Sequence, residues 1–206
     1  VFWSHSDTEE IINGYKAWGN DVLNHLDGKF AIALYDMASR QFFLVRDRLG
    51  VKPLYFSVQG GVLSFASEIK ALWVLPWMRK KINPLAQYLY LTFMVAPAPL
   101  TIFDGVYKLP AGFYARCDAQ RRVSFHEWYN PLKPIEPVDT AWYANESVCV
   151  ERIRDLLIAS TAKRMVADVP VGAFLSGGLD SSLNVALMAQ GGQRIKTFTI
   201  AIDGDT

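Results

Sequence analysis

The sequence of 206 residues predicts an α+β region followed by the start of an α/β region. The first observation is a front part in which short apolar strands follow one another in hairpin order, with short helices between them. The second is a change near residue 147, where a long helix, a buried strand, a glycine-rich turn, a helix and a strand succeed one another. The strand–helix–strand order at the end predicts a βαβ unit of a parallel sheet.

Composition supports a globular chain and excludes several classes of protein. Hydrophobic residues make up 51 % and charged residues 20 %, which indicates a substantial core rather than disorder. The chain has 21 Lys and Arg residues and 20 Asp and Glu residues, so it lacks the excess of positive charge that is typical of a nucleic-acid-binding protein. No apolar run reaches the ~18 residues of a membrane span. Cys117 and Cys149 suggest neither a disulfide framework nor a zinc site, and we expect a reducing, cytoplasmic location.

The front part begins with a helix at 7–19, where Asp7 or Thr8 is the expected N-cap and Gly19 the stop. The run 30–35 is apolar on both faces, which predicts a strand buried on both sides. A Gln-Gly-Gly turn at 59–61 predicts a hairpin. The remaining expected elements are the helices 20–25, 68–75 and 82–93 and the strands 41–47, 53–58, 62–67, 113–118 and 122–129.

Three prolines and no periodicity mark residues 130–146 as a linker between a domain at 1–129 and a second at 147–206. The second domain is expected to contain the amphipathic helix 148–168, with Val150, Ile153, Leu157 and Met165 near one face, the strand 169–175, the helix 183–190 and the strand 195–203. Both ends of the chain look like sequence from within a domain, so we expect an internal fragment.

The glycine-rich turn 176–182 has the composition of a phosphate-binding loop. Two glycines allow a sharp turn and close approach of backbone N–H groups, and the following helix contributes its N-terminal dipole. Asp180 would repel phosphate unless Mg²⁺ lies between them. The residues of this turn do not match a Walker A loop, which needs G-x-x-x-x-G-K-S/T, or the dinucleotide-binding motif G-x-G-x-x-G. The alternative is a tight turn in which Asp180 only caps the helix. The residues concerned are Ser176, Gly177, Gly178, Asp180, Ser181 and Ser182.

The run from Asp168 to Ser182, with SGGLDSS at its end, resembles the pyrophosphate-binding loop of N-type ATP pyrophosphatases, and among them the glutamine-hydrolysing asparagine synthetases. That family also carries a class II (N-terminal nucleophile) glutamine amidotransferase domain. The front half resembles its second part in the runs 4–9, 26–31, 46–55, 66–72 and 108–112. The resemblance implies a partial amidotransferase sandwich, the C-terminal part of a glutaminase domain, joined to the N-terminal part of an ATP-binding synthetase domain.

The resemblance also implies roles for single residues. Asp7 would bind the α-amino group of glutamine, with capping of the first helix as the alternative. The loop 176–182 would bind ATP, Leu175 and Ile200 would frame the nucleotide, and Asp180 would hold the metal. No residue of this chain is expected to be catalytic, because the family's N-terminal cysteine nucleophile has no counterpart. We expect Arg46, Asp47 and Arg48 to form a structural ion-pair cluster that holds the strand and turn.

The expected activity of the full-length protein is asparagine synthesis from aspartate, glutamine-derived ammonia and ATP, with AMP and pyrophosphate as products. ATP and Mg²⁺ are the expected cofactors, and the fragment itself is expected to be inactive. One alternative is a related amide ligase that acts on another carboxylate, as in β-lactam, lasso-peptide, peptide or sugar amidation. Another is a non-catalytic nucleotide-binding remnant. Unpaired sheet edges would favour either association, for example into a homo-oligomer, or instability.

Overall fold

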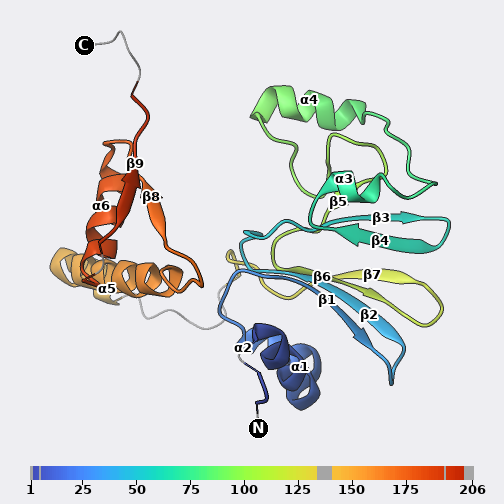
Figure 1. Ribbon diagram of the computed structural model, residues 1–206, viewed down its shortest axis with the longest axis horizontal. Helices are drawn as coiled ribbons and strands as arrows, with labels where there is room; N and C mark the ends of the chain where they lie inside the picture. Colours follow the sequence, from blue (N-terminus) through green and yellow to red (C-terminus); the bar gives the residue numbers. More distant parts are fainter. Residues whose placement is uncertain (1, 5, 134–140, 193, 202–206) are drawn as a thin grey trace. The chain divides into compact units, whose positions relative to one another are not determined.

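The computed structural model describes residues 2–4, 6–133, 141–192 and 194–201. The chain divides into two compact units, Val1–Lys133 and Pro134–Thr206, and Figure 1 labels the elements of each. The first unit is α+β and antiparallel, and the second contains a parallel strand pair, as the sequence predicts.

The first unit contains two antiparallel sheets that share one core. The larger sheet has the order β1 (Ala31–Asp36), β2 (Gln41–Arg46), β6 (Phe113–Cys117) and β7 (Val123–Glu127). The smaller has the order β4 (Val62–Ala66), β3 (Tyr55–Gln59) and β5 (Tyr107–Lys108). Leu44 and Ala115 from the larger sheet are buried together with Phe56 of β3 and the flanking Leu54 and Leu109. These residues form the apolar interior of a sandwich.

Three short helices cover the other face of the larger sheet, namely α1 (Asp7–Trp18), the 3₁₀ turn η1 (Gly19–Asp21) and α2 (Val22–His25). Val22 and Leu23 of α2 pack against Phe43 and Val45 of β2. The N-cap of α1 is Ser6, not the expected Asp7 or Thr8. The Ser6 hydroxyl accepts the Thr8 N–H at 3.2 Å, and Ser6 keeps an extended backbone while Asp7 is already helical.

The strand β1 is half-buried on one face and exposed on the other, so the expectation of burial on both sides is wrong. Ile32 and Leu34 pack under the helices. Alternate residues on the other face, Ala31, Ala33 and Tyr35, are exposed. The cause is position in the sheet, because β1 is an edge strand and the smaller sheet packs over β2 and β6. Apolar composition of a strand does not by itself reveal whether a second layer covers it.

Two more helices lie between β4 and β6 in the chain. The helix α3 (Ile69–Leu72) is a single turn, shorter than the expected 68–75, whereas α4 (Pro84–Phe93) agrees with expectation. Asn83 caps α4 by accepting the Ala86 N–H at 3.2 Å, and Pro84 follows in the first turn. The short strand β5 was not predicted, because it follows a proline-punctuated stretch.

The second unit contains the turn η2 (Ala141–Ala144), α5 (Glu146–Arg164), β8 (Gly172–Phe174), α6 (Leu179–Ala189) and β9 (Lys196–Phe198). β8 and β9 pair in parallel, which confirms the βαβ unit. The expected apolar face of α5 is only partly covered, because Val150 and Ile153 are 58 % and 53 % exposed whereas Leu157 and Met165 are half-buried.

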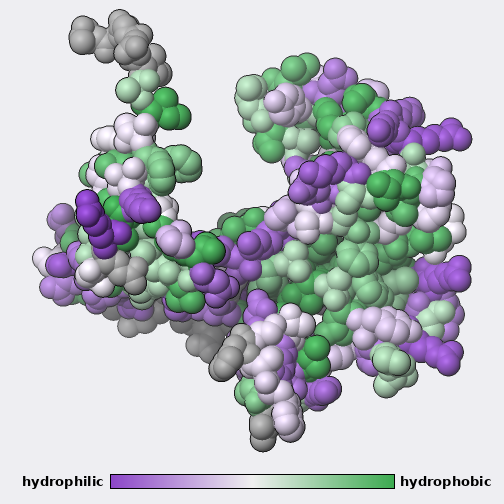
Figure 2. Space-filling view, viewed as in Figure 1, coloured by the Kyte–Doolittle hydropathy of each residue, from purple (hydrophilic) through white to green (hydrophobic). Residues whose placement is uncertain are grey.

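Apolar side chains also reach the surface of the first unit, as Figure 2 shows over its strands and on α4. Leu85, Leu91 and Phe93 of α4 are all more than half exposed. Within the described ranges, the helices lack the combination of length and apolarity that a bilayer crossing requires.

Candidate functional site

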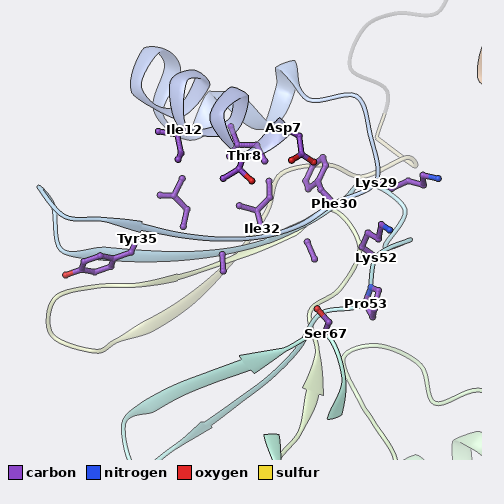
Figure 3. Close-up of a pocket in the computed structure, with 14 residues that line it drawn as sticks. Asp7, Thr8, Ile12, Lys29, Phe30, Ile32, Tyr35, Lys52, Pro53 and Ser67 are labelled. Atoms are coloured by element: carbon purple, nitrogen blue, oxygen red, sulfur yellow. The ribbon is translucent and has the colours of Figure 1, made fainter. Parts of the chain in front are cut away.

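A cavity of about 750 Å³ lies beside α1 and β1 in the first unit. Asp7 and Thr8 line it from the first turn of α1, and residues 29–35 line it along β1. Lys52, Pro53 and Ser67 contribute from two later segments of the chain. Figure 3 shows Asp7 and Thr8 pointing from the helix toward β1, with Lys52 and Pro53 on the adjoining loop. The residues that line the cavity therefore include one carboxylate, three hydroxyl-bearing side chains and two lysines, Lys29 and Lys52.

Asp7 lies at the helix N-terminus but does not cap it. Its side chain is exposed on the cavity, and the capping hydrogen bond belongs to Ser6. The nearby Glu9 is used differently, since its carboxylate accepts the backbone N–H groups of Trp3 and Ser4 at 2.8 and 2.7 Å. Hydrogen bonding with Ser4 and these backbone bonds hold the Glu9 pKa below its usual value. The Asp7 carboxylate thus has the accessibility that a ligand-binding group needs.

The loop that carries Lys52 and Pro53 is built around Asp47. This side chain is 1 % exposed. Its Oδ1 accepts the N–H groups of Leu49 (3.1 Å) and Val51 (2.9 Å), and its Oδ2 accepts that of Lys52 (2.9 Å). Burial is the largest single influence on the Asp47 pKa and raises it, but the backbone hydrogen bonds together outweigh burial and leave the pKa lowered.

The flanking arginines also bind backbone groups, so the expected ion-pair cluster is not what holds this turn. Arg46 donates to the carbonyl oxygens of Lys52 (2.9 Å), Gly50 (2.7 Å) and Leu109 (2.6 Å). Arg48 donates to Leu26 O at 2.9 Å and lies over the rings of Trp128 and Tyr129. The structural role expected for the three residues holds, through different bonds.

The second candidate site is the glycine-rich turn between β8 and α6. Gly177 has φ +80°, a conformation that favours glycine. Gly178 is the N-cap of α6 and provides no side-chain cap. The helix begins at Leu179, four residues earlier than expected, so Asp180, Ser181 and Ser182 belong to its first turn. Asp180 is therefore not the cap. Ser181 Oγ lies 3.1 Å from Ser176 Oγ and donates to Gly178 O at 3.0 Å.

Leu175 and Ile200 lie at the same edge of the parallel pair. Leu175 follows β8 and donates its N–H to Phe198 O at 2.9 Å, while Thr199 Oγ1 donates to Leu175 O at 2.7 Å. Ile200 is 86 % exposed just after β9. The carboxyl edge of a parallel sheet is where such folds bind ligands.

The donor set of this turn fits a phosphate group. It combines a helix of 11 residues without a side-chain cap, two neighbouring hydroxyls and a glycine with open space around it. The exposed Asp180 carboxylate could supply one metal ligand, as Mg²⁺ requires when phosphate provides others. Within the described ranges, no cluster of three or more His, Cys, Asp or Glu side chains could hold a metal on its own.

The remaining titratable candidates have structural surroundings. His25 stacks on Trp18 and His126 on Tyr114, while His5 lies outside the described residues. Cys117 and Cys149 are free thiols. Sequence reasoning missed Lys52 and Ser67 as cavity residues. Both lie in motifs that it had singled out, but only the folded structure shows which of their residues reach the cavity.

The antiparallel sandwich with its cavity and the βαβ unit with its uncapped helix give the chain two candidate sites of different kinds. The family model described as "Glutamine amidotransferase domain" matches residues 1–129, and the one described as "Asparagine synthase" matches residues 152–206. The chain belongs to the glutamine amidotransferase domain family.

Individual relatives agree with this membership. A putative asparagine synthetase [glutamine-hydrolyzing] of Mycobacterium bovis is 36 % identical over 98 % of this chain and 31 % of the relative. Asparagine synthetase [glutamine-hydrolyzing] 1 of Bacillus subtilis is 30 % identical with the same coverage. Amidase chry2 of Gibberella zeae is 32 % identical over 88 % of this chain and 26 % of the relative. The chain therefore spans between 26 and 38 % of the length of the curated relatives it matches.

A solved structure aligns with most of the chain. It is the glutamine phosphoribosylpyrophosphate amidotransferase of B. subtilis, with a TM-score of 0.40 and 14 % identity over 97 % of this chain and 40 % of that one.

Proposed function

We propose that the chain is part of a glutamine-dependent asparagine synthetase that cleaves ATP to AMP and pyrophosphate. Residues 1–129 would be the C-terminal part of its glutaminase domain, 130–146 a linker and 147–206 the beginning of its ATP-binding domain. The observation that carries the proposal is the presence, in one chain, of a cavity with an accessible carboxylate and a glycine turn before an uncapped helix. The two family models that match these parts support the assignment.

Asp7 would bind the α-amino group of glutamine. An ammonium group and a carboxylate form a charge-assisted hydrogen bond, which is stronger than one between neutral groups. Ser6 leaves the Asp7 carboxylate available by capping α1 in its place. Hydrolysis of the bound glutamine would release ammonia and glutamate.

The turn 176–182 would hold the pyrophosphate part of ATP. Helix N–H groups and the hydroxyls of Ser176, Ser181 and Ser182 would donate hydrogen bonds to its oxygens, and Leu175 and Ile200 would frame the nucleotide. Asp180 would hold Mg²⁺, which neutralises phosphate charge when bound. Transfer of AMP to the aspartate side-chain carboxylate would release pyrophosphate. Ammonia would then displace AMP from the acyl carbon to form asparagine.

The second candidate function is a related ligase that acts on another acceptor. It is supported by the similarity to amidase chry2, a relative that is not named as an asparagine synthetase. AMP formation by the full-length protein that is stimulated by aspartate supports the synthetase. Stimulation by a different carboxylate alone supports the second candidate, and ATP binding without turnover indicates a non-catalytic remnant.

Two variants of the full-length protein test the proposed glutamine site and the proposed ATP site separately. Asp7→Asn should raise the KM for glutamine about 10-fold or more and leave synthesis from added ammonia unchanged. Asp180→Asn should reduce exchange of pyrophosphate into ATP and leave glutamine hydrolysis unchanged. Glu10→Gln, on the same helix as Asp7 but outside the cavity lining, is the control for the first. Equal effects of D7N and E10Q on the KM would contradict the role given to Asp7.

A further inference from the structure

Two walls of the Asp7 cavity are tied together by one buried residue. The main-chain N–H of Asp47 donates to Phe30 O at 3.0 Å, and its carboxylate accepts the Lys52 N–H at 2.9 Å. Phe30 and Lys52 both line the cavity, Phe30 just before β1 and Lys52 on the loop after β2. Asp47 therefore fixes the separation of two segments that are more than 20 residues apart in the sequence.

The wall at Lys52 is held from both sides of its backbone. Asp47 binds its N–H, and Arg46 Nε donates to its carbonyl oxygen at 2.9 Å. The Lys52 side chain is exposed, and in the part of the chain that the structure describes its ammonium group makes no hydrogen bond or ion pair. A residue with a fixed backbone and an unused side chain is suited to shape a binding site rather than to stabilise the fold through that side chain.

Organising a surface loop around a buried carboxylate is energetically unfavourable compared with using a neutral side chain. Removing the charge from water is unfavourable unless hydrogen bonds compensate for it, and neutral Asn or Ser side chains also organise turns. Charge-assisted bonds are shorter and stronger than neutral ones, so they hold a backbone more firmly. Asp47 uses three of them on consecutive parts of the loop that ends at the cavity.

We propose that Asp47 is a positioning residue for the glutamine site, because it sets the distance between the β1 wall and the Lys52–Pro53 wall of the cavity. The proposal rests on the function proposed above. It predicts that weakening the bond from Asp47 to Lys52 changes the binding of glutamine and not the chemistry that follows.

The test uses Asp47→Asn in the full-length protein. Asn keeps one carbonyl oxygen, which can still accept the Leu49 and Val51 N–H groups, but it turns an NH₂ group toward the Lys52 N–H. The KM for glutamine should rise about 10-fold while kcat stays within about twofold, and synthesis from ammonia should not change. Arg46→Lys, which removes the bond to Lys52 O, should raise the same KM and serves as the second variant if D47N does not fold.

Thr101→Val is the matched control. Thr101 is 3 % exposed in the same unit, donates to Val106 O at 2.7 Å and lies outside the cavity lining. T101V should lower the unfolding stability without changing the KM. If D47N leaves the KM unchanged, or if T101V raises it equally, Asp47 is only a structural residue and the proposal is wrong.

Failure of the proposed function gives a different result. In that case the parent protein neither binds nor hydrolyses glutamine, and the claim about the walls is decided by amide hydrogen exchange. D47N should then speed exchange of the Lys52 amide at least 10-fold relative to T101V. Unchanged protection of that amide would overturn the claim.

Discussion

Replacement of Gly112 by alanine tests how closely the end of the run 108–112 is packed against the segment that follows β7. Gly112 has φ +69°, and an added Cβ would overlap the carbonyl oxygen of Tyr129. The Gly112 carbonyl accepts the N–H groups of Trp128 (2.8 Å) and Tyr129 (3.1 Å), and its own N–H donates to Asp47 O at 3.0 Å. The methyl group has no flexible side chain to displace, so the two backbone segments must separate.

The expected loss follows from two contributions. A non-glycine residue in the left-handed region costs about 1–2 kcal/mol. Separation of the segments weakens the two bonds that Gly112 O accepts, at ~0.5–1.5 kcal/mol each. Gly112→Ala should therefore destabilise the first unit by about 2–5 kcal/mol. Gly61→Ala is the control, because Gly61 has φ +74° and nothing within 4 Å of an added Cβ. It should cost only about 1–2 kcal/mol.

Urea unfolding followed by the NMR signal of the Trp128 indole N–H measures the loss in the first unit. This group donates to Arg46 O at 3.2 Å, so its signal reports the junction that the variant disturbs. The midpoint for G112A should fall well below that for G61A at an unchanged slope. Equal midpoints would show that the contact with Tyr129 O is relieved without cost, which would refute the steric argument.

Three further variants test separate features. Ser6→Ala removes the cap of α1 and should destabilise this helix by about 1 kcal/mol. The loss should be seen as faster hydrogen exchange of the Thr8 amide. Unchanged exchange would mean that another group caps the helix. Leu109 is 0 % exposed, so Leu109→Ala should lower the free energy of unfolding by about 2–5 kcal/mol, measured by urea titration. A loss below about 1 kcal/mol would contradict the place of Leu109 in the core. The lowered pKa of Asp47 contributes stability that is present above the ordinary Asp pKa of about 4 and is lost as the pH falls through the lower folded value. Unfolding free energies measured from pH 7 to 2.5 should therefore fall less steeply below pH 4 in D47N than in the parent, and parallel curves would exclude this linkage.

Local sequence signals predicted the elements that short-range physics determines. The turn at Gly60–Gly61, the stop at Gly19 and Pro84 in the first turn of α4 all lie where turn and cap chemistry places them. The start of α6 was missed for a reason that is also local. Asp180 and Ser181 were interpreted as turn residues, yet such residues are also favoured in the first turn of a helix.

Tertiary arrangement accounts for the features that could not be predicted. The exposed face of β1 depends on where the second sheet ends, and β5 exists because Tyr107 and Lys108 pair with β3. The composition of the cavity depends on a bond from Asp47 to Phe30 that no sequence spacing reveals. Asp7 could be singled out because its motif is contiguous, whereas Lys52 required the fold.

The runs 46–55 and 108–112, on which the resemblance partly depends, meet at one hydrogen-bonded junction. Arg46 donates to Leu109 O, Gly112 N donates to Asp47 O, and the Trp128 indole donates to Arg46 O. The side-chain atoms of Arg46 and Asp47 are engaged with backbone groups, so little of their bonding capacity is left for a ligand. These motifs therefore identify the fold by fixing its backbone. Side chains that the junction holds in place but does not bind, such as that of Lys52, are the ones left free to contact a ligand.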